Sequence, residues 1–362
     1  MFVAWRDLRF AKGRFVLIGL VIVLITLLVE LLSGLTAGLG RQNVSAITGL
    51  PADKIVFNAP AAGQSVSYSD STVTESQWQR WATAPGVRSA QPLGITTTKA
   101  EAGDHSAGVS VFGVAPGSSL APDGDKISDR TAVLSVSAAD DLGVATGDTF
   151  TLAGQTVTVA AISGDASFSH TPVIWTSLAR WQLTAPPGGS PGTPTATVIA
   201  VTADGDADLP AIDEAAGTKT VTKDGSLSAI GSYTSENGSL QLMRGFLFVI
   251  SALVIGAFFT VWTMQRSGDV AILKALGAPT RRLLGDALGQ AVVLLGLGTS
   301  LGTGLATGFG ALIAGTAIPF QLSVGTVLFP AAVMIALGAV GAALPLRRIA
   351  SVDPLIALGS AR

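Results

Sequence analysis

A single carboxylate, Glu30, stands inside an apolar run that extends from Phe15 to Gly40. At about 1.5 Å per helical residue it lies about 22 Å from Phe15, in the outer half of a hydrocarbon core about 30 Å thick. Helical periodicity places Thr26 and Ser33 on the same face. A charge within a membrane helix is costly and marks a functional site by default. The pattern predicts that Glu30 contacts a substrate, with Thr26 and Ser33 beside it. The alternatives are a structural pair or hydrogen bond to another helix, or a span that is placed differently.

Two residues at the outer start of a second apolar run are candidates for the same site. Met243 adds apolar or sulfur contact, and the Arg244 guanidinium can pair with a carboxylate of the substrate. The alternative for Arg244 is that it anchors its helix at the membrane interface.

The composition indicates a membrane protein. Apolar residues make up 48% of the 362 residues and charged residues only 13%, and the mean hydropathy is +0.54, which exceeds what an ordinary soluble domain shows. The first run is too long for the apolar core of a signal peptide, so we expect a retained anchor. Four spans are predicted, at 15–40, 240–264, 286–318 and 324–346.

Basic residues give the orientation. Half of the 22 Lys and Arg residues lie in three short segments, 1–14, 265–285 and 347–362, and such segments stay in the cytoplasm. Both termini are therefore expected inside, the first on an amphipathic N-terminal segment. Residues 41–239 and the short loop 319–323 are expected outside.

The outer segment 41–239 differs in kind, because it holds 19 of the 24 acidic residues and is rich in Gly, Ser, Thr and Pro. "DTFTLAGQTVTVAAI" alternates apolar residues about a Gly turn, which predicts a hairpin. "TESQWQRWATAPGV" predicts a helix capped by Thr74 and ended before Pro85. The predicted fold class is an α-helical membrane protein with four transmembrane helices and an α+β extracytoplasmic domain between the first and second.

Few motifs support chemistry of the chain's own. No P-loop is present, and His105 and His170 lack metal-ligand spacing, so both are interpreted as ordinary surface or core residues. No catalytic residue and no intrinsic cofactor is predicted. The chain has no cysteine and a net charge of −2, which argues against nucleic acid as a partner.

Two further patterns concern helix contacts. Gly298/Gly302 and Gly304/Gly308 have a spacing that permits close helix packing in lipid, with a gating hinge as the alternative. The inner segment "SGDVAILKALGAP" places Ile272 and Leu276 around Lys274 and ends at Gly277, so it predicts a short amphipathic helix. Such a helix needs a partner surface, either a protein or membrane lipid.

This segment, together with the C-terminal "PLRRIASVDPLIALG", resembles the FtsX/MacB-type permeases of ATP-binding-cassette (ABC) systems. The N-terminal "AWRDLRFAKGRFVLIGLVIVLI" is similar to the DevC/HrtB branch, whose HrtB members export haem. The resemblance implies a bacterial plasma-membrane permease that forms a homodimer and is driven by two copies of a separate ATPase, which alone bind ATP. It implies haem as the substrate. Ferric iron accepts oxygen ligands, so the buried Glu30 carboxylate is a candidate ligand of the haem iron. The implied ATPase contacts are Asp269, Ile272, Lys274, Leu276 and Gly277.

Three functions remain open at this point. The first is export of haem or a similar amphiphile, taken sideways from the membrane near Glu30. The second is export of a lipid-anchored or peptide substrate by the same architecture. The third is FtsX-like mechanotransmission without transport. A buried acid on a small-residue face favours the first, because a mechanotransmitter has no evident need for it.

Overall fold

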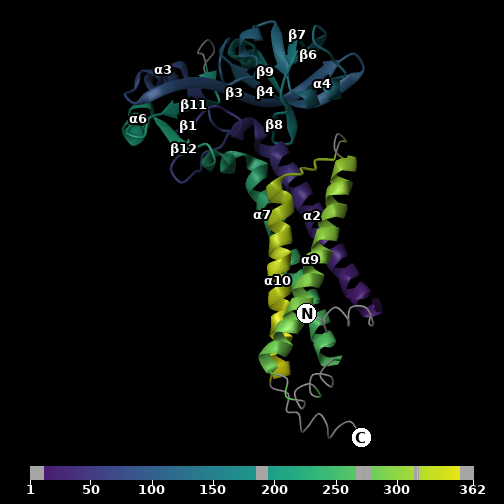
Figure 1. Cartoon of the computed structure of the whole chain (residues 1–362). Helices are drawn as coiled ribbons and strands as arrows, with labels where there is room; N and C mark the ends of the chain where they lie inside the picture. Colours follow the sequence, from purple (N-terminus) through teal and green to yellow (C-terminus); the bar gives the residue numbers. More distant parts are fainter. Residues whose placement is uncertain are drawn as a thin grey trace. The chain divides into compact units, whose positions relative to one another are not determined.

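The computed structural model describes residues 12–184, 195–265, 272, 277, 279–313, 316 and 318–350. The chain folds as two units (Figure 1). One consists of residues 39–238, and the other combines the described parts of 1–38 and 239–362. These limits lie beside those predicted for the outer segment, 41 and 239.

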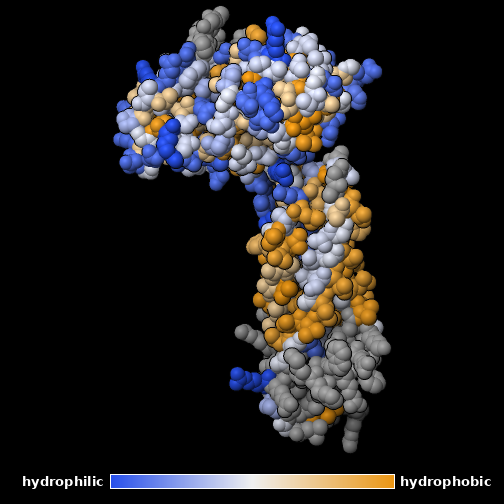
Figure 2. Space-filling view, turned by 45° about the horizontal axis from the view of Figure 1, so that its top comes forward, coloured by the Kyte–Doolittle hydropathy of each residue, from blue (hydrophilic) through white to orange (hydrophobic). Residues whose placement is uncertain are grey.

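The membrane unit contains four helices that are long and apolar enough to cross a bilayer, as the sequence predicts. Their surface is largely hydrophobic in Figure 2, whereas the other unit shows a mainly hydrophilic surface. The helices are α2 (Lys12–Thr48), α7 (Gly231–Gln265), α9 (Thr280–Ile313) and α10 (Val324–Ala350).

Two of these helices continue past the predicted spans. Helix α2 runs on to Thr48 rather than ending at 40, and α7 begins at Gly231 rather than at 240. The added turns belong to the outer unit, where Ile47 and Leu50 beside the end of α2 are buried in its core. Burial in that core stabilises helical turns that hydropathy alone excludes from the span.

One hydrophobic cluster joins all four membrane helices. Its members are Ile18, Ile22, Val29, Ile255, Phe259, Trp262, Ala291, Leu295, Met334 and Ala342. Glycines permit the close approach: a methyl group at Gly341 of α10 would lie 3.3 Å from the Ala252 carbonyl oxygen of α7, and one at Gly338 would lie 2.4 Å from Leu295 of α9. The bundle is therefore held by backbone proximity as well as side-chain packing.

The outer unit is an α+β domain, as predicted. Its strands are β1 (Lys54–Asn58), β2 (Val73–Thr74), β3 (Val87–Ala102), β4 (His105–Val114), β5 (Thr131–Leu134), β6 (Thr149–Leu152), β7 (Gln155–Ile162), β8 (Ser167–Phe168), β9 (Thr171–Ser177), β10 (Thr195–Ala196), β11 (Val198–Ala203) and β12 (Thr218–Thr222). Its helices are α3 (Glu75–Thr83), α4 (Val136–Leu142), α5 (Leu178–Thr184) and α6 (Leu209–Ala216), with 3₁₀ turns η1 (Gly124–Lys126) and η2 (Gly225–Ala229).

Strand β3 organises the sheet because two groups of strands share it. The strand order is β12-β1-β11-β3-β4-β9-β5-β7-β6, and β6 also pairs with β3. That last pairing, Ala100 with Leu152, closes six strands from β3 to β6 into a ring. Most neighbours are antiparallel, but β4 with β9 and β5 with β7 are parallel.

Two local predictions for this domain are confirmed. The hairpin consists of β6 and β7, antiparallel and joined through Ala153 and Gly154, both with positive φ. The helix is α3, which begins after Thr74; the Gln77 side-chain oxygen accepts a hydrogen bond from the Thr74 amide at 2.8 Å. Local turn and capping chemistry is therefore sufficient to define both elements.

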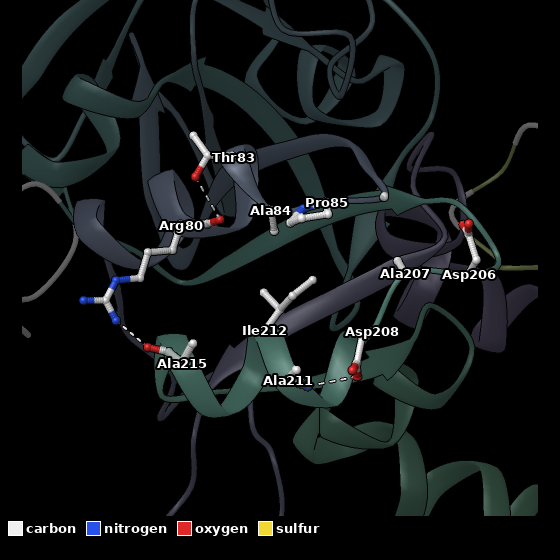
Figure 3. A pocket seen from close by; sticks show the side chains of 11 residues that line it. Arg80, Thr83, Ala84, Pro85, Asp206, Ala207, Asp208, Ala211, Ile212 and Ala215 are labelled. Carbon is white, nitrogen blue, oxygen red and sulfur yellow. Dashed lines mark hydrogen bonds between the residues drawn. The ribbon is translucent and has the colours of Figure 1, made fainter.

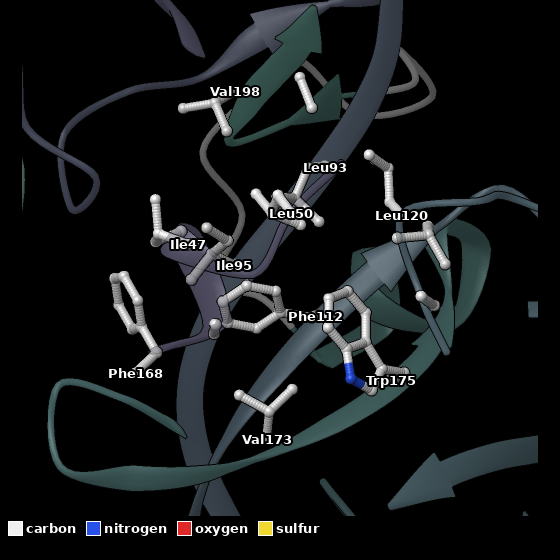
Figure 4. Close-up of a cluster of buried hydrophobic side chains, with 14 of the residues drawn as sticks. Ile47, Leu50, Leu93, Ile95, Phe112, Leu120, Phe168, Val173, Trp175 and Val198 are labelled. Carbon is white, nitrogen blue, oxygen red and sulfur yellow. The ribbon is translucent and has the colours of Figure 1, made fainter. Parts of the chain in front are cut away.

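The largest core of the domain lies where the sheet meets the end of α2 (Figure 4). Ile47 and Leu50 pack with Leu93, Phe112 and Trp175 from β3, β4 and β9. All five side chains are nearly inaccessible to solvent. The end of the first membrane helix is thus part of the outer domain's interior.

Candidate functional site

The predicted face of α2 is buried within the membrane unit. Thr26, Glu30 and Ser33 are 0%, 3% and 1% exposed, whereas Leu24 and Leu28 on other faces are more than half exposed. The polar side chains therefore point into the bundle and the leucines away from it, as helical periodicity predicts.

Two glycines on α9 allow this helix to pack closely against α2. A methyl group at Gly298 would lie 2.7 Å from Ile22 Cγ2, and one at Gly302 would lie 2.7 Å from Thr26 Cβ. Gly304 and Gly308 differ, because a methyl group on either would meet no atom of the described structure within 4 Å. The first G-xxx-G pair thus packs on α2, and the second faces away from it.

Glu30 is bonded by a residue that sequence reasoning missed. The Thr303 hydroxyl on α9 donates a 2.5 Å hydrogen bond to Glu30 Oε1. No motif indicates this partner, although Thr303 follows directly on Gly302, whose spacing with Gly298 predicts a close helix contact. The structural alternative for Glu30, a hydrogen bond across helices, is thus present at one of its two oxygens.

The second oxygen of Glu30 has no partner in the part of the chain that the structure describes. Glu30 Oε2 and the hydroxyls of Thr26, Ser33 and Thr299 are buried and without hydrogen bonds among the described residues. Buried polar atoms are nearly always paired in folded proteins. We name this group of Thr26, Glu30, Ser33, Thr299 and Thr303 the polar seam. Its open oxygens suit a ligand that donates hydrogen bonds or carries positive charge.

Phe320, in the loop before α10, covers one end of the polar seam. Its ring occupies the space that side chains at Gly34 of α2 and Gly310 of α9 would fill. The Gln321 amide donates to the Gly34 carbonyl at 3.1 Å. Gly34 lies one turn beyond Glu30, so this aromatic ring closes the seam next to the carboxylate.

Met243 and Arg244 are not joined to Glu30 by any interaction in the described part of the chain. Met243 is 49% exposed. The Arg244 guanidinium carbon lies 6.0 Å from the centre of the Phe329 ring on α10, a cation–π distance. This contact ties the guanidinium to a neighbouring helix, and both the substrate role and the interfacial anchoring role of Arg244 stay predictions.

The predicted ATPase contacts lie mostly outside the described residues, as Asp269, Lys274 and Leu276 do. Ile272 is helical and 51% exposed. Gly277 has a φ of +90°, which favours glycine and suits a helix end. The predicted coupling helix therefore stays a prediction.

The outer domain has a groove between the end of α3 and the start of α6, with a volume of about 550 Å³ (Figure 3). Ala84, Pro85 and Ile212 form an apolar wall, and Arg80 is already bonded to the Ala215 carbonyl oxygen. No group of three or more His, Asp or Glu residues in the described structure is placed to hold a metal ion.

His170 belongs to a paired polar cluster in the outer domain. Its Nε2 lies 2.7 Å from Glu236 Oε2, and the same oxygen accepts a 3.0 Å hydrogen bond from Asn43 Nδ2. The Ser232 hydroxyl donates to Asn43 Oδ1 at 3.3 Å. We name Asn43, His170, Ser232 and Glu236 the junction cluster, since it links the outer ends of α2 and α7 to the turn between β8 and β9. His170 is therefore a histidine held by polar contacts of the fold, and its predicted role as an ordinary surface or core residue stays a prediction.

Four membrane-spanning helices, a buried polar seam and a large α+β domain inserted after the first helix define a multi-pass membrane permease. The MacB-like periplasmic core domain matches residues 15–219, more than half of the chain, and the FtsX-like permease C-terminal domain matches residues 242–354. The chain belongs to this family and is an ABC transporter permease of the FtsX/MacB type.

Named relatives cover the whole chain. The putative hemin transport system permease protein HrtB of Staphylococcus haemolyticus is 28% identical over 366 residues, which is 99% of each chain. An uncharacterized ABC transporter permease of Mycobacterium bovis is 26% identical over 369 residues, again 99% of each. The crystal structure of the periplasmic region of MacB from Actinobacillus actinomycetemcomitans aligns with 52% of this chain and 96% of its own, at 13% identity and a TM-score of 0.36.

Proposed function

We propose that this chain is the membrane subunit of a homodimeric ABC exporter that expels haem, or a similar amphiphile, taken laterally from the membrane near Glu30. The observation that carries the proposal is the unpaired Glu30 Oε2 in the polar seam, on a face that is otherwise small and polar. Similarity to a hemin transport permease over 99% of the chain supports the same substrate. Haem is the cargo here, and ATP binds to the partner subunit alone.

The chemistry of the seam fits such a substrate. Ferric haem joins a flat apolar macrocycle to an iron that accepts oxygen ligands, as in tyrosine-ligated haem proteins. A carboxylate oxygen supplies such a ligand and offsets positive charge, and the apolar helices accommodate the macrocycle. Met243 and Arg244 would add apolar contact and a cation for the propionates if the substrate extends to α7.

A second copy of the chain completes the exporter in this proposal. Leu20, Leu24 and Leu28 on α2 and Leu253 on α7 are each more than half exposed. These apolar faces suit contact with the first two spans of a second protomer, with membrane lipid covering the remaining surface. Such a dimer would contain two Glu30 side chains, one from each protomer, available to bind substrate.

Titration of haem into the purified full-length protein tests the substrate assignment. We expect a Soret band that saturates with protein, much weaker binding by Glu30→Gln, and partial retention by Glu30→Asp, where the charge retreats by one methylene. Glu236→Gln is the matched control, because it removes a carboxylate that is already paired. Equal affinity of wild type and Glu30→Gln, at equal dimer content by size-exclusion chromatography, contradicts haem ligation. That result favours a lipid or peptide substrate, or mechanotransmission.

Coupling to the ATPase is proposed to run through Asp269, Ile272, Lys274, Leu276 and Gly277. The family implies an ATPase partner, and the chain itself has no P-loop. Replacing Ile272 and Leu276 together with Asp should detach or silence two copies of the ATPase while leaving membrane insertion intact. Normal co-purification with the ATPase and normal ATP turnover by that double variant would contradict this contact. ATP hydrolysis by the purified permease alone would contradict the assignment of hydrolysis to a separate subunit.

Both termini are proposed to be cytoplasmic, in the plasma membrane of a bacterium. The chain has no cysteine, so single cysteines at Ser69 and Ser360 report topology without background. A membrane-impermeant maleimide added to intact cells should label the cysteine at 69 and spare the one at 360. The reverse pattern contradicts the orientation.

A further inference from the structure

The hydrogen bond between Thr303 and Glu30 crosses from one membrane helix to another. Hydroxyls inside helices commonly bond the carbonyl four residues earlier, and Thr36, Thr260 and Thr307 do so here. Thr303 instead donates to a carboxylate on α2 at 2.5 Å. A distance of 2.5 Å lies at the short end of the range for O–H···O hydrogen bonds.

The backbone of α9 is shaped to bring this hydroxyl to Glu30. Because Gly302 has no side chain, α9 approaches Thr26 and the Val23 carbonyl more closely than any other residue would permit. Thr303 is the next residue along the helix. Gly302 therefore sets the short distance between the two helices, and Thr303 spans that distance with its hydrogen bond to Glu30.

We propose that Thr303 is a positioning residue of the substrate site, which holds Glu30 Oε1 so that Oε2 faces the ligand. This inference rests on the proposed function. A glutamate side chain has several rotatable bonds and loses entropy when it is fixed in place. Fixing one oxygen before the substrate arrives removes that cost from the binding step.

The rest of the polar seam defines the part of the substrate that Oε2 meets. The hydroxyls of Thr26, Ser33 and Thr299 belong to the same buried group and have no partner among the described residues. Each hydroxyl can donate or accept a hydrogen bond. Phe320 supplies an aromatic face one turn beyond Glu30. The site therefore takes an amphiphile that has an electropositive or hydrogen-donating centre in an apolar body.

The test compares full-length Thr303→Val, Thr303→Ser and Thr307→Val dimers in haem titrations followed by absorbance. Valine keeps the shape of threonine without the hydroxyl, so we expect haem affinity about fivefold weaker, because the Glu30 side chain must then be immobilised during binding. Serine keeps the hydroxyl and should bind within about twofold of wild type. Thr307 bonds only its own helix backbone, so Thr307→Val should match wild type.

A second comparison separates positioning from structural support. If Thr303 acts through Glu30, Thr303→Val added to Glu30→Gln should weaken haem binding no further than Glu30→Gln alone. Additive losses overturn the proposal. Thr303→Ala also lacks the hydroxyl and replaces the valine variant if that protein does not form dimers.

The outcomes also separate this inference from the proposed function. Wild type that fails to bind haem overturns both. Wild type that binds haem, with Glu30→Gln weakened and Thr303→Val or Thr303→Ala unchanged, overturns the positioning role alone. A loss of about fivefold in Thr303→Val that Thr303→Ser restores supports both.

Discussion

Two carboxylates, Glu236 on α7 and Glu30 on α2, differ in their exposure to solvent: the Glu236 side chain is 31% exposed, whereas Glu30 is 3% exposed. Glu236, in the junction cluster of the outer domain, shares one oxygen between Asn43 and His170. Glu30, in the polar seam of the membrane unit, has one oxygen held by Thr303 and one without a partner among the described residues. The second oxygen of a partly exposed carboxylate can bond water, whereas a buried oxygen without a partner costs stability that a ligand can offset. The comparison fits a structural role for Glu236 and the binding role proposed for Glu30.

The largest effect is expected from a change that overfills the seam. Gly302→Val would place a side chain against Thr26 and the Val23 carbonyl oxygen, and overpacking of this kind costs about 3 kcal/mol. Thermal unfolding of the detergent-solubilised protein should show a clear drop in midpoint. Gly304→Val is the matched control, because no described atom lies within 4 Å of a methyl group there. Equal midpoints for the two variants would falsify the packing of α9 on α2.

The junction cluster should be the next most sensitive region. Asn43→Ala removes an amide that is 2% exposed and bonds Glu236 and Ser232. Loss of these bonds within a buried site should cost about 2 kcal/mol of stability. Haem affinity should stay at the wild-type value. Unchanged unfolding together with altered haem binding would reverse the roles assigned to the two regions.

A paired tyrosine in the outer domain extends the comparison. Tyr68 is 5% exposed, and its hydroxyl donates to the buried Ser226 hydroxyl at 2.9 Å. Burial raises the pKa of Tyr68, with the Ser226 bond acting in the opposite direction. Tyr68→Phe should cost about 1 kcal/mol, since Ser226 keeps its bond to the Lys223 carbonyl. Tryptophan fluorescence during thermal unfolding gives the measurement, and a stabilised variant contradicts the expectation.

The smallest effect belongs to an exposed carboxylate. Hydrogen bonds from Lys126 and Ser163 lower the pKa of Asp123 from its usual value of 3.8. A lowered folded-state pKa contributes stability that is complete above the unfolded-state pKa and is lost as pH falls through the folded-state pKa. Asp123→Asn should therefore change unfolding midpoints slightly at neutral pH and flatten their dependence below pH 3.8. Parallel pH profiles for variant and wild type contradict this role.

Local sequence patterns predicted much of the fold. Length and hydropathy identify four membrane helices, the Gly turn in "LAGQ" identifies the β6–β7 hairpin, and Thr74 with Gln77 marks the start of α3. These features depend on neighbours in the chain, which is why they are visible in the sequence. The closed ring from β3 to β6 is not visible, since it depends on the pairing of Ala100 with Leu152.

The helix ends show the same division. Hydropathy ends the first span at 40 and begins the second at 240, because polar residues follow and precede them. The structure continues both helices into the outer domain, where Ile47 and the junction cluster secure them. Burial against distant strands stabilises these turns, and no pattern in the local sequence contains that information.

For the candidate site, the sequence by itself determined that Thr26, Glu30 and Ser33 share one face of α2, because a helix fixes that geometry from spacing alone. It also determined that Gly298 and Gly302 permit close packing. Tertiary structure decided the rest: that this glycine pair faces α2 while Gly304 and Gly308 do not, and that Thr303 bonds Glu30. It also left Arg244 beside Phe329. Which faces of two helices meet is set by the packing of the whole bundle, so the partner of a buried carboxylate emerges only when the helices are assembled.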